Sequence, residues 1–194
     1  AQRLFPLSTL PILFSCLGIS VAHAQSPAAA TALPATAVPA AATSLPPSGL
    51  DAFAAYAGIW QSDIQYHDTP YSKQYDARYQ LRNDCWRSAG FYVCNQFVDG
   101  ASKALVVFMY DPLKGYSSYP IPTAGAGAVH PGRVTIEAKV WTFPWQVQKG
   151  GKTTYFHVIN TWTSQDRIEF RQEYSEDGKQ WRPMAEGHEV RVKG

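Results

Sequence analysis

An alternation of apolar and polar side chains with a period of two is the feature that most constrains this chain. Residues 59–66, 75–82 and 167–174 each carry apolar side chains at every second position, with polar or charged ones between them. Because neighbouring residues of a strand point to opposite faces, such segments are typical of half-buried antiparallel strands. β-Branched and aromatic residues mark three further strands, at 104–110, 134–141 and 153–162.

Short turns separate these segments. Their turn-forming residues are Asp99-Gly100, Asp111-Pro112, Gly150-Gly151 and Glu176-Asp177-Gly178. Short strands joined by tight turns predict an all-β domain, an antiparallel up-and-down β-barrel of eight or nine strands, with a β-sandwich as the alternative. Closure removes the strand edges that an exported β protein would otherwise have to protect.

The residues before the first strand divide into three parts. Residues 1–24 have the order of a signal peptide: basic Arg3, an apolar run, and Ala22-His23-Ala24 as the cleavage site. Residues 25–48 are almost entirely Ala, Pro, Thr and Ser, which predicts a disordered linker. A short helix with a capping box at residues 48–51 then opens the folded domain, 49–194.

This leader predicts export, to the periplasm of a Gram-negative bacterium or beyond it, with cleavage after Ala24. The alternative is a lipoprotein in which Leu13-Phe14-Ser15-Cys16 is the acylated box. The apolar run is short and broken by Pro11 and Gly18, so no membrane span is expected in the mature form.

Export makes a disulfide the expected state of Cys85 and Cys94. If Ala89 and Gly90 form a two-residue turn, the two cysteines face each other at a non-hydrogen-bonded position of the hairpin. Side chains come closest at such positions, so the spacing allows a disulfide bridge. A metal site is not expected, because the partner ligands are missing.

Charge and aromatic content limit the classes of partner that are expected for this chain. Without Arg3 the chain holds 16 basic and 15 acidic residues, and these are interspersed, so nucleic acid is not an expected partner. All six Trp and all eleven Tyr lie after residue 50. So many rings in a small β domain indicate a thick core or a lined cavity.

The predicted folded domain resembles a known protein family. A short helix that runs into Gly58-Ile59-Trp60 is similar to the Gly-x-Trp motif of lipocalin-like (calycin) barrels. The resemblance implies that an Arg near the end of the last strand stacks on Trp60, and Arg191 is the residue that matches. Residues 174–181 also resemble the Ser-x-Asp-Gly-x-x-Trp hairpin of an uncharacterised family of secreted bacterial domains with this fold. Gln61-Ser62-Asp63 differs from the Gly-rich segment of haem-binding relatives, which argues against haem.

One face of each strand is predicted to line an apolar interior cavity, because the opposite face carries most of the charge. The residues assigned to the interior are Tyr79, Leu81, Phe91, Val93, Leu105, Val107, Ile136, Val140, Tyr155, His157, Ile168 and Phe170. His130 is added from the flexible segment 125–132, and Trp141 and Trp145 from a run that Pro144 should bend or end. These two Trp rings belong either to a ligand-contacting rim or to the core.

The candidate ligand contacts are therefore Tyr79, Phe91, Leu105, Val107, His130, Trp141, Trp145, Tyr155, His157 and Phe170. An aromatic-lined barrel predicts binding of a small apolar or aromatic molecule, with no cofactor or metal. No nucleophile elbow or phosphate loop is present, so no catalytic residue is identified. The alternatives are an enzyme that uses the cavity, a haem protein, and an envelope protein-interaction module with a filled interior and an exposed aromatic patch.

Overall fold

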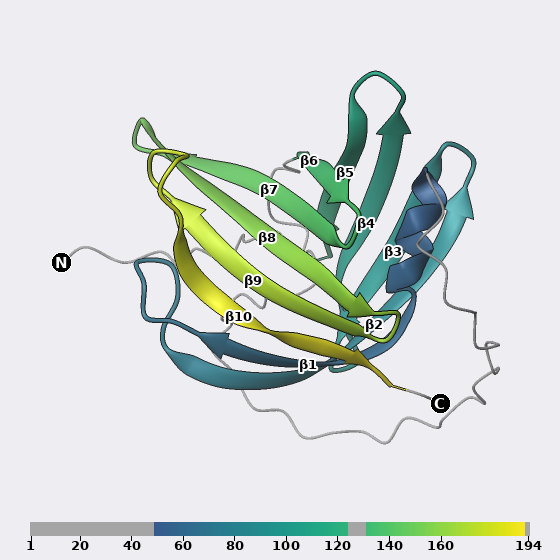
Figure 1. The fold of residues 1–194 in the computed structure, drawn as a ribbon, viewed down its shortest axis with the longest axis horizontal. Coiled ribbons are helices and arrows are strands. Elements are labelled where there is room, and N and C mark those ends of the chain that lie inside the picture. Colours follow the sequence, from purple (N-terminus) through teal and green to yellow (C-terminus); the bar gives the residue numbers. More distant parts are fainter. Residues whose placement is uncertain (1–48, 124–130, 193–194) are drawn as a thin grey trace.

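The folded domain is a closed antiparallel barrel (Figure 1). The structure, a computed structural model, describes residues 49–123 and 131–192. One 3-10 helix, η1 (Leu50–Tyr56), precedes ten strands: β1 (Gly58–Tyr66), β2 (Tyr75–Ser88), β3 (Phe91–Val98), β4 (Ala101–Asp111), β5 (Gly115–Pro122), β6 (Gly132–Glu137), β7 (Val140–Lys149), β8 (Lys152–Ser164), β9 (Arg167–Ser175) and β10 (Arg182–Arg191). Each strand pairs with its sequence neighbours, and β1 pairs with β10 to close the barrel. The predicted up-and-down barrel is confirmed.

The barrel has ten strands, where eight or nine were expected. The first difference is β5, which contains Pro120 and Pro122, residues that argue against a strand. β5 pairs with β6 only at residues 116–118. Pro120 and Pro122 lie beyond this pairing, so their register partners are in β4 alone. The second difference is a turn at Ala138, with φ of 52°, which divides the expected strand 134–141 into β6 and β7.

The β2–β3 hairpin has the predicted register. Ala89 has a φ of 47°, and the turn places Cys85 opposite Cys94. Their sulfur atoms are bonded, so the disulfide is confirmed. The Cys94 side chain faces the interior and is fully buried.

Arg191 ties the last strand to the first, as predicted. Its guanidinium carbon lies 4.1 Å from the centre of a Trp60 ring, and the two residues are register partners in β1 and β10. The same guanidinium donates hydrogen bonds to the carbonyl oxygens of Ala55 and Ala57, where η1 ends, and to the Asp166 carboxylate. One side chain therefore joins η1, β1, β10 and the β8–β9 turn.

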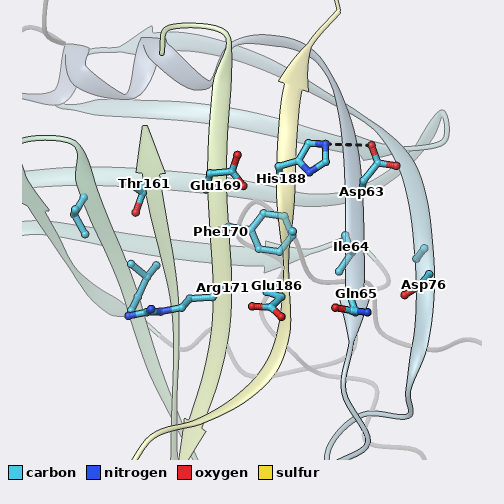
Figure 2. A pocket seen from close by; sticks show the side chains of 14 residues that line it. Asp63, Ile64, Gln65, Asp76, Thr161, Glu169, Phe170, Arg171, Glu186 and His188 are labelled. Atoms are coloured by element: carbon cyan, nitrogen blue, oxygen red, sulfur yellow. Dashed lines mark ion pairs between the residues drawn. The ribbon is translucent and has the colours of Figure 1, made fainter. Parts of the chain in front are cut away.

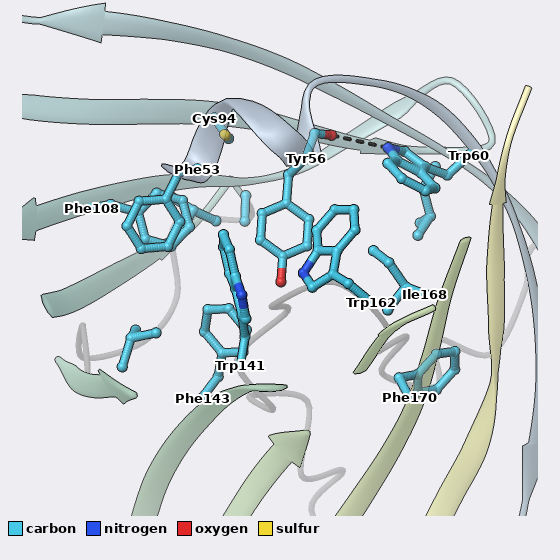
Figure 3. Packing of buried hydrophobic residues seen from close by; sticks show 14 of the residues in the cluster. Phe53, Tyr56, Trp60, Cys94, Phe108, Trp141, Phe143, Trp162, Ile168 and Phe170 are labelled. Carbon is cyan, nitrogen blue, oxygen red and sulfur yellow. Dashed lines mark hydrogen bonds between the residues drawn. The ribbon is translucent and has the colours of Figure 1, made fainter. Parts of the chain in front are cut away.

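Helix η1 fills the end of the barrel at which β1 begins. Its Phe53 stacks on Phe108 of β4, with ring centres 3.8 Å apart, and its Tyr56 ring packs edge-on against Trp141 of β7 (Figure 3). Trp162 lies 5.1 Å from Tyr56, between ring centres. All of these rings are less than a tenth exposed, so this half of the interior is a packed aromatic core.

A second, smaller cluster closes part of the opposite end. Trp145 stacks on Phe156, and Tyr71 from the β1–β2 connection packs edge-on against Phe156 and Tyr174. Met184 and Val158 complete this cluster. No helix among the described residues is long and apolar enough to cross a membrane.

Candidate functional site

The ten candidate ligand contacts do not share one face of the barrel wall. Four point inward: Tyr79, Trp141, Trp145 and Phe170. Five lie on the outside, because they alternate with buried inward residues: Phe91, Leu105, Val107, Tyr155 and His157. The remaining one, His130, falls outside the described residues. The predicted leader and linker also fall outside them.

The inward faces of β3 and β4 are the opposite of those predicted. Tyr92, Cys94, Val106 and Phe108 are buried in the interior, so Phe91, Val93, Leu105 and Val107 point outward. Both faces of these strands are apolar, and alternation alone therefore cannot identify the inner one. The disulfide decides it, because a fully buried Cys94 fixes the face of its neighbours.

The same inversion occurs in β7 and β8. Trp141 faces inward, so its neighbour Val140 points outward and is 39% exposed. In β8 the inward residues are Phe156, Val158, Asn160 and Trp162, all buried, so Tyr155 and His157 lie on the outer wall. Pro144 does not end β7, and its register partner is His157 of β8.

His157 takes part in a half-buried charge cluster on the outer wall. Its Nε2 lies 2.6 Å from a carboxylate oxygen of Glu173, and Trp181 stacks on the imidazole with ring centres 3.7 Å apart. Arg171 pairs with the other oxygen of Glu173 at 3.3 Å. Trp181 comes from the β9–β10 connection, so the cluster fastens that connection to β8.

Trp141 belongs to the core. Its side chain is fully buried between Phe53, Tyr56 and Trp162. The Tyr56 hydroxyl accepts a hydrogen bond from the Asn160 amide at 3.0 Å. Burial raises the pKa of Tyr56 well above its usual 10.0, and nearby Glu189 raises it further. A phenol held neutral here acts as a structural group of the packed aromatic core around η1.

The inner face of β2 is less buried than the inner faces of β8 and β9. Tyr75 and Tyr79 point inward, but both are only half-buried; Tyr75 lies at the end of the barrel away from η1, and Tyr79 lies opposite Ser62 in the middle of β1. The Tyr75 ring stacks on that of Tyr66 in β1, with ring centres 4.5 Å apart and planes 13° from parallel. Burial and a hydrogen bond with Tyr75 raise the pKa of Tyr79 to about 12. We call Tyr66, Tyr75 and Tyr79 the tyrosine row.

The tyrosine row contains one predicted contact and two that sequence reasoning missed. Tyr79 was chosen from its strand face, whereas Tyr66 and Tyr75 were not among the candidate contacts. Their signal in the sequence is position: Tyr66 ends β1, Tyr75 begins β2, and antiparallel pairing puts them opposite each other. Because β3 ends at Val98, opposite Leu81, the row lies beyond the β2–β3 register.

A groove of about 770 Å³ crosses the outer wall over β8, β9, β10, β1 and β2 (Figure 2). Two rows of outward side chains line the groove, and the register partners Phe170 and Gly187 lie between these rows. Four carboxylates line it, those of Asp63, Asp76, Glu169 and Glu186, together with Arg171 and His188.

Most of the groove's carboxylates already have basic partners. Asp63 pairs with Arg78 at 2.8 Å and with His188 at 3.6 Å. Arg167 and His67 pair in the same way with Glu169 and Glu186. Exposed pairs of this kind contribute little to stability, and their charges are largely compensated. Nor do residues 49–123 and 131–192 contain a group of three or more metal-ligating side chains able to hold a metal ion.

Comparisons with known proteins identify no family for this chain. No protein-family model matches the chain, and no curated protein matches it. Among solved structures, the crystal structure of Rv2717c from M. tuberculosis is similar with a TM-score of 0.46 at 10% sequence identity, covering 74% of this chain and 96% of that chain. A likeness at this level carries no information on function.

Proposed function

We propose that this chain is an exported β-barrel that binds a small aromatic molecule on the tyrosine row, at the end of the barrel away from η1. The observation that carries the proposal is the contrast in packing along the inner wall. Trp60, Trp141 and Phe143 are 0% exposed, whereas Tyr75 and Tyr79 keep part of their rings accessible. A half-buried inward ring keeps surface for contact with a ligand ring.

The geometry of the tyrosine row suits an aromatic ligand. Tyr66 and Tyr75 are already stacked nearly parallel, and a third ring could extend that stack in the offset arrangement that aromatic pairs prefer. The Tyr79 hydroxyl is neutral at physiological pH and already takes part in a hydrogen bond with Tyr75. The ligand class is therefore a small aromatic molecule held by ring stacking.

Export is part of the proposal. It is supported by the leader pattern of residues 1–24 and by the Cys85–Cys94 disulfide, since disulfides form and persist mainly in oxidising compartments.

Two contacts also support the resemblance to secreted bacterial domains with a lipocalin-like fold. One is the stack of Arg191 on Trp60. The other is the hairpin in which Asp177 accepts hydrogen bonds from the backbone N–H groups of Lys179 and Gln180 before Trp181.

Titration with the neutral fluorescent dye N-phenyl-1-naphthylamine tests the proposal. Loss of one stacking ring should cost about 1.4 kcal/mol, or a tenfold rise in Kd, so Tyr79→Ala and Tyr75→Ala should each bind the dye about tenfold more weakly. Phe91→Ala is the matched control, because Phe91 is an aromatic residue of the outer wall, 40% exposed. Equal affinity in Tyr79→Ala and wild type, or a loss in Phe91→Ala alone, would contradict the proposal.

A further inference from the structure

The outer wall over β2 to β5 is apolar across four strands. The register aligns Trp86, Val93, Val107 and Tyr119 in one row across the wall, and Phe91 and Met109 in the next. Leu105 and Ile121 form a third row on the other side of Val107. We call these eight residues the apolar wall: Trp86, Phe91, Val93, Leu105, Val107, Met109, Tyr119 and Ile121.

The apolar wall is unlike the rest of the barrel surface. Trp86 is 46% exposed, and Phe91, Met109 and Ile121 are each between 37% and 40% exposed. Asn95 and Ser117, which interrupt these rows, are uncharged, and Asp84, at the β2 end of the third row, pairs with Arg82 at 3.3 Å. On the outer wall over β9, β10 and β1, by contrast, most outward residues are charged or histidine. Large exposed apolar patches of this kind mark interaction sites.

We propose that the apolar wall is the dimer interface of this protein, covered by the same wall of a second copy. Strands β2 to β5 are paired with their neighbours in the barrel. Over most of its area, the apolar wall therefore presents side chains to a partner and no free strand edge. The partner must therefore pack face to face, as one sheet packs on another about 10 Å away. An uncharged wall is best covered by an uncharged wall, and a second copy supplies one.

Charges at the two ends of β4 indicate the relative orientation. Lys103 and Asp111 flank the outward residues Leu105, Val107 and Met109 of the same strand. A two-fold axis that lies in the interface and crosses β4 at Val107 makes the two β4 strands antiparallel. Lys103 of each copy then lies toward Asp111 of the other, and the charges are complementary.

The Asp111 carboxylate is held in place for this role. It accepts hydrogen bonds from the backbone N–H groups of Leu113 and Lys114, at 2.8 and 3.1 Å. These bonds lower the pKa of Asp111 from its ordinary 3.8, and the group is negatively charged at physiological pH. The side chain is therefore both fixed and charged at one end of the wall.

The extent of the wall sets the expected strength. Four strands about 4.8 Å apart and five residues of about 3.4 Å each cover roughly 300 Å² per copy. That area is the core of an interface, and with a polar rim it falls in the small class typical of weak and transient complexes. The dimer should therefore dissociate at micromolar concentrations.

Sedimentation velocity on the full chain, from about 1 to 200 μM, tests the interface. Val107→Asp places a carboxylate at the two-fold axis and should weaken the dimer at least tenfold, because two like charges would be buried opposite each other. Val140→Asp is the matched control: Val140 is outward and 39% exposed, but lies on β7 outside the apolar wall, so it should dimerise like wild type.

Lys103→Glu gives a second readout at the rim, where folding is not at risk. It should weaken the dimer severalfold, and the effect should shrink as salt is added. A wild-type chain that stays monomeric at 200 μM, or a Val107→Asp dimer as strong as wild type, would overturn the proposal. The result is separate from ligand binding, because the tyrosine row lies on the inner wall and Val107→Asp should leave dye affinity unchanged.

Discussion

Arg191→Met should be among the most damaging single substitutions outside the aromatic core. Methionine keeps most of the stem that packs on Trp60, but it removes the guanidinium that donates to Ala55, Ala57 and Asp166. The carbonyl oxygens of Ala55 and Ala57 lie at the end of η1, where no further helical N–H group donates to them. In the variant these partly buried oxygens would lose their hydrogen-bond donor.

The contacts of Arg191 give the magnitude. A hydrogen bond to a charged group contributes about 1.5 to 3 kcal/mol, and a cation over an aromatic ring about 0.5 to 2 kcal/mol. The side chain is 25% exposed, and the contacts are not additive, so we expect a loss of about 3 kcal/mol from the free energy of unfolding. A loss of that size is a large part of the stability of a domain this small.

Urea denaturation followed by Trp fluorescence, with the disulfide intact, measures this loss. Arg78→Met is the control, because Arg78 also pairs with an aspartate but is 70% exposed, and its loss should stay within about 1 kcal/mol. If Arg191→Met unfolds within about 1 kcal/mol of wild type, or no earlier than Arg78→Met, then Arg191 does not hold the barrel closed.

Three further predictions concern the backbone, the disulfide and acid stability. In Gly187→Ala the new methyl group would collide with a backbone carbonyl of β1, so the protein should lose several kcal/mol or fail to fold, whereas Gly90→Ala, which meets nothing within 4 Å, should melt within a few degrees of wild type. Removing the disulfide with Cys85→Ser and Cys94→Ser together should cost about 2.5 kcal/mol in urea, since the bridge closes a loop over a separation of 9 residues; an unchanged midpoint would show that the hairpin needs no bridge. Backbone hydrogen bonds lower the pKa of Asp177, so its contribution to the free energy of unfolding is present above the ordinary value of 3.8 and is lost as pH falls through the lowered pKa. Asp177→Asn should therefore lose less stability than wild type between about pH 6 and about pH 2. Parallel curves of stability against pH for the two proteins would contradict this.

Local rules were enough to predict the parts of the fold that neighbouring residues determine. The turn at Ala89 and Gly90 sets the register of its hairpin, and that register alone brings Cys85 to Cys94. In β9, charged and polar residues mark the outer face, so the inward face with Ile168 and Phe170 was predicted correctly.

The faces of the other strands depend on contacts that no local pattern contains. Leu105 and Val106 are equally apolar, and only the buried Cys94 on the neighbouring strand makes Val106 the inward one. His157 was assigned to the interior together with Tyr155, on the same face of its strand, but both faces of β8 carry apolar residues. It lies outside because Glu173 and Trp181, distant in sequence, supply its partners there.

The proposed site was only partly predictable for a related reason. Tyr79 was identified from its strand face, but the sequence does not show that η1 fills the other half of the barrel. Phe53 and Tyr56 are ordinary residues of a short helix until the barrel closes around them. Their packing makes Trp141 part of the core, whereas Tyr75 and Tyr79 of the tyrosine row stay only half-buried.

Locating the bound dye by NMR tests the central claim most directly. In the chain with ¹³C-labelled tyrosine rings, titration with N-phenyl-1-naphthylamine should shift the ring signals of Tyr66, Tyr75 and Tyr79 through ring currents of the stacked ligand. Tyr119, on the apolar wall, should keep its signals at the same dye concentration. Shifts at Tyr119 with none in the tyrosine row would place binding on the outer surface and contradict the proposed function.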